Sequence, residues 1–398
     1  MLQSSLSNMY YQPQKKRKVA AAAAPTARQK KPVAPPAPSP YALVPEPAPT
    51  RERIFEPAPP QQQQDLIFVS VPSYRDPELI GTLEDMFKKA KYPHRIIAGV
   101  CQQIHDDKDR AFDLRHTTSA IIRRFSEKNI RLMTLPATDA KGPAWARSEI
   151  EKNLLGQDEV FFLGIDSHTA FQPHWDVLVI NELLACPADK PMLSCYPQDY
   201  ERRMTKGAAV RTVNAKLPVC FMKFNAFHDK IGLPQTERFP FKRQPKGPVP
   251  SIFISAGFIF TIADVIREAP YEPLPYLFLG EEILMNWKYW KIGVKFFSPS
   301  KHIVFHLNDR TYRSLFWENY YLSSNGKKTN VPESVRQERK DQESASLEYV
   351  KSILGAEEQL PFWQEVGIDF AKREASKNAI WGVTQNPSQD EVRVKVGP

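Results

Sequence analysis

The chain has few cysteines, and they follow no pattern. Its 398 residues include only Cys101, Cys186, Cys195 and Cys220, at irregular spacings and with no Cys-x-x-Cys pair. Disulfide-stabilised secreted domains and cysteine-ligated zinc modules are built from dense or regularly spaced cysteines. The observed spacing therefore indicates reduced, buried thiols rather than either of these arrangements.

Long apolar runs are also missing. No stretch approaches the roughly 20 apolar residues that cross a lipid bilayer. The opening sequence, MLQSSLSNMYYQPQ, lacks the apolar core of a signal peptide. Together with the reduced cysteines, these absences predict a cytoplasmic or nuclear protein that does not bind a membrane.

The first 64 residues differ in composition from the rest. They contain an alanine run, repeated Pro-Ala units and a glutamine run, and too few large apolar residues to offset the entropy lost on ordering. They carry nine basic and three acidic residues, so only +3 of the formal net charge of +9 belongs to residues 65–398. We therefore expect a disordered basic tail, followed by a part too weakly basic for a nucleic-acid-binding fold.

One segment of the tail, Gln14–Val19 (QKKRKV), resembles a short nuclear-import signal. Such clusters also occur as solvated parts of disordered segments. A nuclear-import receptor as a partner and a plain basic tail are both compatible with the sequence.

From residue 65 onward, β-rich runs alternate with helical patterns. We expect strands at 66–71 (ended by Pro72), 95–101, 130–135 and 159–165, and helices at 76–92, 117–128 and 141–155. This alternation predicts an α/β fold whose early strands are parallel. The run 159–165 is almost wholly apolar, which predicts a central strand.

The second half is less regular. Helices are expected at 175–185, 279–292 and 332–354, and strands at 193–195, 251–261, 294–297 and 302–307. Residues 201–247 are polar and rich in Lys, Arg and Pro, and are predicted to form a long loop. The end of the chain, 390–398, is expected to be frayed.

The triplet Asp166-Ser167-His168 follows the predicted central strand. Ligands bind at the carboxyl ends of strands in α/β sheets, and this spacing places an acid and an imidazole on one open loop. A carboxylate oxygen and an imidazole nitrogen are compatible with Mn²⁺ or a similar ion. The alternative is that Asp166 caps the following turn and His168 is an ordinary surface residue.

Two segments are candidates for contacting a nucleotide. Ser70, Arg75 and Asp76 lie at or after the first strand, where Asp76 can meet a ribose and Arg75 a diphosphate. Gly142 opens a helix whose N-terminus suits an anion, and Arg147 lies one turn further on. The alternatives are a helix cap at Asp76 and a solvated arginine on an amphipathic helix.

Two further segments carry ionisable pairs. Glu281 and Glu282 begin a predicted helix, where one of them can bind an acceptor or sugar hydroxyl. The alternative is that both are simply stabilised by the helix dipole. His302 and His306 lie four apart on a predicted strand and so face the same side. One of them can complete a metal site, or both are plain strand-end residues.

Six ordered segments together resemble one family. They are FVSVPSYRDPELIGTLEDMFKKAKYP from Phe68, RIIAGVCQQ from Arg95, GPAWAR from Gly142, FFLGIDSHTAF from Phe161, SAGFIFT from Ser255, and PYEPLPYLFLGEEILMNWKYWKIGVKFFSP from Pro270. In these motifs the chain resembles the cytoplasmic N-acetylglucosaminyltransferases that modify hydroxyproline on the Skp adaptor subunit of ubiquitin ligases. The resemblance spans residues 65–354, with a weaker echo at 367–370.

This resemblance implies a type-A glycosyltransferase (GT-A) fold, with a Rossmann-like nucleotide-binding half and a mixed central sheet. It implies a D-x-D-type metal motif in which Asp166, His168 and His306 hold Mn²⁺ or another divalent cation. Ser70, Arg75, Asp76, Arg147 and Asp166 map to the donor pocket, and the catalytic acceptor-side carboxylates are Glu281 and Glu282. The implied reaction moves GlcNAc from UDP-GlcNAc to a protein hydroxyl such as hydroxyproline, with retention and an α-linkage.

We expect the chain to consist of three parts. Residues 1–64 form the tail, 65–310 the catalytic domain and 311–398 a helical C-terminal extension. The basic segment 201–247 and the helix sequence MNWKYWKIG depart from the family pattern and leave the acceptor open. Two alternatives remain: a type-A transferase using UDP-glucose or UDP-galactose on a glycan, and a non-enzymatic nuclear protein acting through its basic tail.

Overall fold

An eight-stranded sheet runs through the part of the chain that the structure, a computed structural model, describes: residues 65–205, 208–319 and 331–376. These residues belong to one unit, residues 58–398. The predicted tail at 1–64 and the predicted frayed end at 390–398 lie outside the described residues. In sheet order the strands are β11 (Val249–Ser251), β13 (Lys295–Ser298), β6 (Pro191–Ser194), β12 (Phe258–Ile262), β4 (Phe161–Ile165), β1 (Ile67–Tyr74), β2 (Ile96–Ile104) and β3 (Ile130–Pro136).

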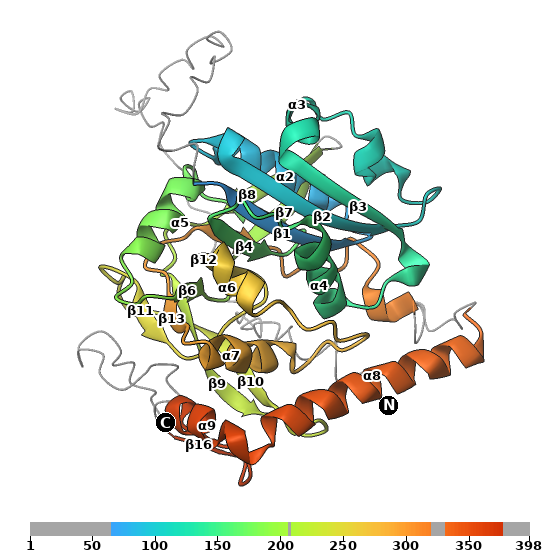
Figure 1. Cartoon of the computed structure of the whole chain (residues 1–398). Helices are drawn as coiled ribbons and strands as arrows, with labels where there is room; N and C mark the ends of the chain where they lie inside the picture. The colour runs from blue at the N-terminus through green and yellow to red at the C-terminus, as the bar shows by residue number, and fades with distance from the viewer. Residues whose placement is uncertain (1–64, 206–207, 320–330, 377–398) are drawn as a thin grey trace, which may run out of the picture. The chain divides into compact units, whose positions relative to one another are not determined.

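Helices cover both faces of this sheet (Figure 1). Side chains alternate along β1, so Ile67 and Val69 pack with α2, α3 and α5 in one hydrophobic core, whereas Phe68 packs with α4, α6 and α7 in the other. The result is an α/β/α sandwich. Its helices are α2 (Glu78–Lys89), α3 (Ala120–Asn129), α4 (Pro143–Leu154), α5 (Trp175–Leu184), α6 (Ala263–Glu268) and α7 (Glu281–Lys291).

The sheet is mixed, as expected. Strands β4, β1, β2 and β3 are mutually parallel, and β4 is central, so both predictions are confirmed. Strand β12 runs antiparallel to β4 and β6. Pro72 was predicted to end the first strand, which is wrong, because β1 continues to Tyr74. Strand β1 pairs with β4 only as far as Ser70, and a proline is tolerated where a strand has a hydrogen-bonded neighbour on one side.

The prediction of a long loop at 201–247 is wrong. The segment contains two hairpins, one formed by β7 (Gln198–Thr205) and β8 (Ala208–Val213), the other by β9 (Cys220–Phe227) and β10 (Pro234–Pro240). The first hairpin extends a small sheet in the order β5 (Thr169–Phe171), β14 (Val304–His306), β7, β8. Cross-strand ion pairs such as Lys223–Glu237, 2.9 Å apart, stabilise partly exposed strands whose composition looks like a loop.

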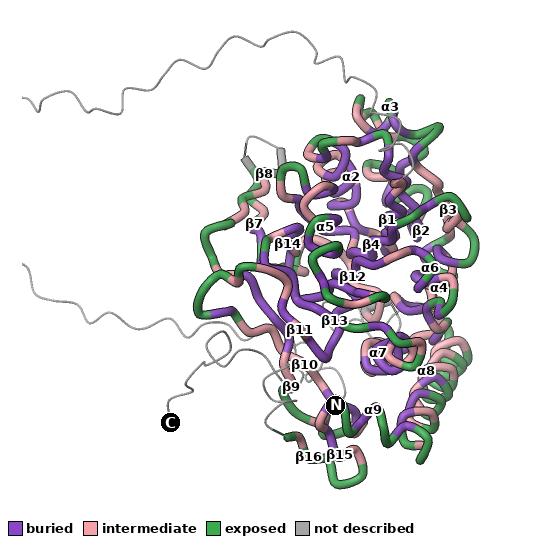
Figure 2. The backbone as a smooth tube through the Cα atoms, turned by 60° about the vertical axis from the view of Figure 1, so that its left-hand side comes forward, coloured by how far each residue is buried: buried purple, intermediate pink, exposed green. Residues whose placement is uncertain are grey.

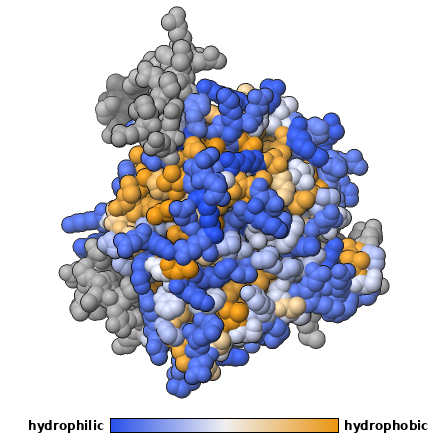
Figure 3. All heavy atoms as spheres, viewed as in Figure 1, coloured by the Kyte–Doolittle hydropathy of each residue, from blue (hydrophilic) through white to orange (hydrophobic). Residues whose placement is uncertain are grey.

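The C-terminal part begins with the charged helix predicted at 332–354, observed as α8 (Glu333–Leu354). Figure 2 shows exposed residues along α8, and Figure 3 shows mainly hydrophilic residues there, while Val350 and Leu354 are buried. Beyond it lie α9 (Leu360–Val366) and a small hairpin of β15 (Ile368–Asp369) and β16 (Glu374–Ala375). Every helix among the described residues is too short or too polar to cross a membrane.

Short 3-10 turns complete the described chain. They span Pro93–Arg95, Arg110–Phe112, Leu114–His116, Ala137–Asp139, Phe316–Asn319 and Glu357–Gln359.

A buried acid on α4 makes stability depend on pH. The backbone N–H of Tyr271 donates to Glu151 Oε2 at 2.6 Å, and burial raises the pKa of Glu151 from 4.5 to about 8. The unfolded chain releases this proton near pH 4.5, whereas the folded chain keeps it to about pH 8, so stability falls as the pH rises through this window.

Glu151→Gln keeps the acceptor for Tyr271 but cannot ionise. The melting temperature of Glu151→Gln minus that of the unmodified protein should be roughly 5 °C larger at pH 9 than at pH 5. Thermal denaturation followed by circular dichroism measures this difference. Glu149→Gln, on the same helix but partly exposed, is the control and should show no such trend; a parallel pH response of Glu151→Gln and the unmodified protein would contradict the prediction.

Candidate metal and nucleotide site

Polar side chains that follow β1, follow β4 and end β14 meet at the carboxyl ends of β1 and β4. Asp76 follows β1, and Asp166 and His168 follow β4, so the parallel pairing of these strands brings the three together. His306 ends β14. Strand β14 pairs with β5, and β5 directly follows the loop that carries Asp166 and His168. Ligand-binding residues in α/β folds gather at this edge of the sheet.

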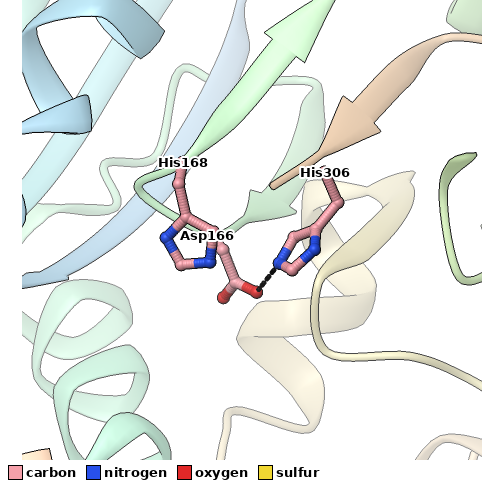
Figure 4. Close-up of side chains that lie close together, drawn as sticks. All are labelled: Asp166, His168 and His306. Atoms are coloured by element: carbon pink, nitrogen blue, oxygen red, sulfur yellow. Dashed lines mark hydrogen bonds and ion pairs between the residues drawn. The ribbon is translucent and has the colours of Figure 1, made fainter. Parts of the chain in front are cut away.

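Asp166, His168 and His306 offer three ligand atoms that all lie within 4.8 Å of one another. Figure 4 shows the three side chains pointing toward a common point. His306 Nε2 lies 3.2 Å from Asp166 Oδ2, and the two imidazole rings are 4.7 Å apart between centroids. One carboxylate oxygen and two imidazole nitrogens are a donor set that Mn²⁺ and similar ions accept.

The outer nitrogen of each histidine is already engaged. His168 Nδ1 is 2.8 Å from Asp76 Oδ2, and His306 Nδ1 is 3.0 Å from Asn308 Oδ1. Metal-binding histidines are usually oriented in this way, by an acceptor on the nitrogen that does not bind the metal. The Nε2 atoms face the Asp166 side of the site, where His306 Nε2 contacts the carboxylate that would share a cation with it, so the residues fit the predicted site.

The ionisation states also suit a cation. Burial would raise the pKa of Asp166, but the hydrogen bond from His306 and the charge of Arg147 hold it well below its usual range. Burial lowers the pKa of His168 to about 4, although Asp76 opposes this. At neutral pH the cluster therefore combines a carboxylate with a neutral imidazole at position 168.

Asp76 is the most heavily bonded group of the site and is 0% exposed. Its Oδ2 accepts from Ser167 Oγ at 2.7 Å besides contacting His168, and its Oδ1 accepts from the Glu78 N–H at 2.9 Å and from the Tyr312 hydroxyl at 3.1 Å. These contacts favour a role in positioning His168. The expectation that Asp76 meets a ribose stays a prediction.

Arg147 connects two acids across the site. Its two terminal nitrogens reach Asp166 Oδ1 at 2.8 Å and Glu281 Oε1 at 3.0 Å. The helix that carries it, α4, starts at Pro143 after Gly142, whose φ of 101° suits glycine. The carboxylates raise the pKa of the guanidinium against the effect of burial. Arg147 thus leaves Asp166 Oδ2 directed at the histidines.

The two adjacent glutamates have different surroundings. Burial raises the pKa of Glu281 to about 7, with the neighbouring Glu282 and Asp166 adding to it and Arg147 opposing it. Glu282 accepts from the Ala256 N–H at 2.8 Å and from the Tyr196 hydroxyl at 2.9 Å. Glu282 therefore holds the 255–257 turn in place, while Glu281 belongs to the Arg147 cluster.

Three candidates lie apart from this cluster. Ser70 is in the middle of β1 and 2% exposed, four residues before the strand ends. Arg75, with φ 48°, turns its Nε to Asp109 Oδ2 at 2.8 Å. His302 precedes β14, so the prediction that it shares a strand with His306 is wrong, and its Nε2 is 2.7 Å from the Leu217 carbonyl oxygen. The donor-pocket roles of Ser70 and Arg75 remain predictions.

Several residues of the site were not anticipated from the sequence. Tyr312 and Arg313 reach Asp76 from the segment after β14, and Asn308 holds His306. Their polar sequence, Asn308 to Arg313, resembles an ordinary turn. The sequence offered one indication of a role in the site: all of these residues lie within seven positions of the candidate ligand His306.

The metal-ligand assignment can be tested by Mn²⁺ binding. His306→Ala removes one of the three convergent atoms and should weaken Mn²⁺ affinity at least tenfold, roughly the size of effect seen for metal-site groups. His302→Ala, whose ring faces Leu217, is the matched control and should bind as the unmodified protein does. Isothermal titration calorimetry gives both values; the reverse order would move the assignment to His302.

The positioning role of Asp76 makes a separate prediction. Asp76→Asn removes the charge that orients His168 and should weaken Mn²⁺ binding about tenfold, within the range for groups behind a ligand. Asp113→Asn, another buried acid that contacts Arg115 instead, serves as control. Electron paramagnetic resonance of free Mn²⁺ measures both affinities, and a melting curve checks folding. Unchanged binding by Asp76→Asn would refute the role.

Comparisons with known proteins give a family. The model of the family "Glycosyltransferase (GlcNAc)" matches residues 66–121 and 105–380, which is well over half of the chain. A search of curated proteins gives no match.

Among solved structures, GalNAc-T7 with UDP, GalNAc and Mn²⁺ is 13% identical, with 75% of this chain and 54% of that chain covered and a TM-score of 0.46. The chain thus spans about half the length of the GalNAc-T7 structure. TarS 1–349 from S. aureus with UDP-GlcNAc is 14% identical, with coverage of 79% and 81% and a TM-score of 0.38. From the family match, the chain belongs to the glycosyltransferase (GlcNAc) family.

Proposed function

We propose that this chain is a metal-dependent GT-A transferase that moves GlcNAc from UDP-GlcNAc to a hydroxyl of a protein, such as hydroxyproline. The observation that carries the proposal is the convergence of Asp166, His168 and His306 within 4.8 Å, in a member of a GlcNAc glycosyltransferase family. The mixed sheet, with its site at the strand ends, is compatible with the implied GT-A fold.

The donor diphosphate belongs beside these three residues. A divalent cation bound there would neutralise the charge that develops on the UDP leaving group. Arg147 supports this in two ways: it fixes the orientation of Asp166 through a 2.8 Å contact, and its guanidinium would lie near the departing diphosphate. Asp76 and Asn308 keep the histidine rings turned to the same point.

The acceptor side is assigned to Glu281. With its pKa raised to about 7, this carboxyl can accept a hydrogen bond from an acceptor hydroxyl or take part in moving its proton near neutral pH. In a retaining reaction the departing diphosphate can itself remove the proton, so Glu281 need not be a strong base. Glu282, bound to Ala256 and Tyr196, shapes the wall of the acceptor site.

The proposal extends to organisation and location. We assign residues 65–310 to the catalytic domain and 311–398 to an extension, which contacts the catalytic part through α8 and α9 packed on α7. We also propose a cytoplasmic or nuclear location, in line with the sparse cysteines and the basic segment Gln14–Val19.

A panel of UDP-sugars tests the donor and the metal together. The purified chain should hydrolyse UDP-GlcNAc in the presence of Mn²⁺ faster than UDP-glucose, UDP-galactose or UDP-GalNAc, and chelation should abolish the reaction. Asp166→Ala and His168→Ala should each lower the rate by at least about a hundredfold, since each removes a metal ligand. UDP release is measured by coupled assay.

The control variant is His302→Ala, which lies outside the cluster. A preference for UDP-glucose would replace the proposed donor. Full activity of both ligand variants would refute the metal-dependent mechanism.

A further inference from the structure

Positive charge is concentrated in one segment of residues 65–398. Residues 198–247, which include both hairpins, contain eleven basic and four acidic side chains, a net charge of +7. Residues 65–398 as a whole carry only +3, so the remainder is acidic. Such a concentration of one sign on a small area attracts ligands of the opposite sign.

Part of this charge is used within the protein. Arg202 and Arg211 lie 2.6 and 2.7 Å from Glu78 on α2, and they attach the β7–β8 hairpin to the body. Arg238 pairs with Asp199 at 2.7 Å. These cations stabilise the hairpins and are not available for a partner.

Other cations are exposed at the loop tips. Lys216, Lys242, Arg243 and Lys246 are all exposed, and within the described ranges none of the four forms an ion pair. Lys301 is 56% exposed and lies 3.7 Å from Glu182, a distance at which its charge is only partly offset. We call these five residues the loop-tip cluster.

Three contacts bring the loops of this cluster together. The Leu217 carbonyl oxygen is 2.7 Å from His302 Nε2, next to Lys301. The Phe241 N–H, next to Lys242, donates to the Val219 carbonyl oxygen at 3.0 Å. Gln244 donates to the carbonyl oxygen of Ser300. Leu217 is 43% exposed, so a large apolar side chain stands among the cations.

The loop-tip cluster lies close to the candidate metal site. His302 is at the cluster and His306 is a metal-ligand candidate, and an extended chain of four residues spans about 13 Å. A bound peptide covers the same distance in about four residues. An acceptor peptide whose hydroxyl lies beside His306 would therefore present side chains four to five residues away to the cluster.

We propose that the loop-tip cluster binds acidic side chains of the protein acceptor, four to five residues from the hydroxyl that receives the sugar. This inference rests on the proposed function and adds the class of acceptor sequence. We favour a protein partner over a single-stranded nucleic acid, because single-strand binding sites combine their cationic groove with exposed aromatic rings on which bases stack. The ring next to the cluster, His302, is stacked on Phe305 with centroids 5.3 Å apart and is bound to Leu217.

The test uses binding of labelled probes to the full chain. The first probe is a 15-residue fluorescein-labelled peptide with a central 4-hydroxyproline and aspartates four and five residues away on both sides. The second has asparagine at those four positions, and the third is a 15-nucleotide single-stranded polyuridine. At low salt the aspartate peptide should bind about tenfold more tightly than the asparagine peptide, as expected for a few exposed charge pairs.

A charge-swap variant and a matched control complete the design. Lys216→Glu/Lys242→Glu/Arg243→Glu should lose the preference for aspartate, and the milder Lys216→Gln/Lys242→Gln/Arg243→Gln should reduce it. Lys108→Glu/Arg123→Glu/Lys128→Glu, with the same change in charge at other exposed positions, should keep the preference.

Donor hydrolysis separates this inference from the function it rests on. UDP-GlcNAc hydrolysis should persist in both loop-tip variants, because the substituted side chains lie outside the metal cluster. Equal binding of the two peptides by the unmodified, hydrolysing chain, or tighter binding of polyuridine than of the aspartate peptide, would overturn the acidic-acceptor inference alone. Failure of the unmodified chain to hydrolyse any UDP-sugar would count against the proposed function instead.

Discussion

Arg147 is buried between Asp166 at the end of β4 and Glu281 at the start of α7. A buried cation is tolerated only when carboxylates compensate it, and removing one partner leaves an uncompensated charge that strongly destabilises a protein. The arginine therefore ties three elements together: α4, the loop after β4 and α7. The hydrogen bond from Arg147 to Asp166 Oδ1 fixes the orientation of the carboxylate. Its Oδ2 then faces the histidines, so the geometry of the candidate metal site depends on Arg147.

A second buried charge, Asp76, acts in the same way on the other side of the site. It holds His168 through Nδ1 and is itself held by Ser167 and Tyr312. Arg202, which pairs with Glu78, also lies over the Tyr312 ring, 5.1 Å from its centroid. The β7–β8 hairpin is thereby connected to the candidate metal ligands through side chains, which gives the hairpin a structural role beside any role in binding a partner.

Under the proposed function, the site would have a donor half and an acceptor half. The proposed donor half consists of strand ends and helix starts whose polar atoms contact one another. Such preorganised groups would suit leaving-group stabilisation without rearrangement. We place the acceptor half at α7, the 255–257 turn and the loops around the hairpins, where exposed cations lie. Variation in such loops alters the partner while the donor chemistry stays the same.

The sequence by itself determined the local elements. The alternation of apolar runs, Pro143 after Gly142, and an Asp-x-His triplet after an apolar strand each depend on neighbours within a few residues, so they could be predicted. The hairpins at 201–247 could not, because their strands are stabilised by cross-strand pairs such as Lys223–Glu237 and by packing on other elements rather than by an apolar pattern.

Only the tertiary structure decided how the site is assembled. Arg147 meets Glu281 across 134 positions, Asp76 meets His168 across 92, and Asp166 meets His306 across 140. Whether such residues touch depends on which strands are neighbours and where each one ends. His302 and His306 look alike in the sequence, but β14 begins only at Val304, so the chain carries one histidine into the site and leaves the other at the Leu217 carbonyl. Local periodicity carries no information on which histidine enters the site, because that depends on how distant elements pack.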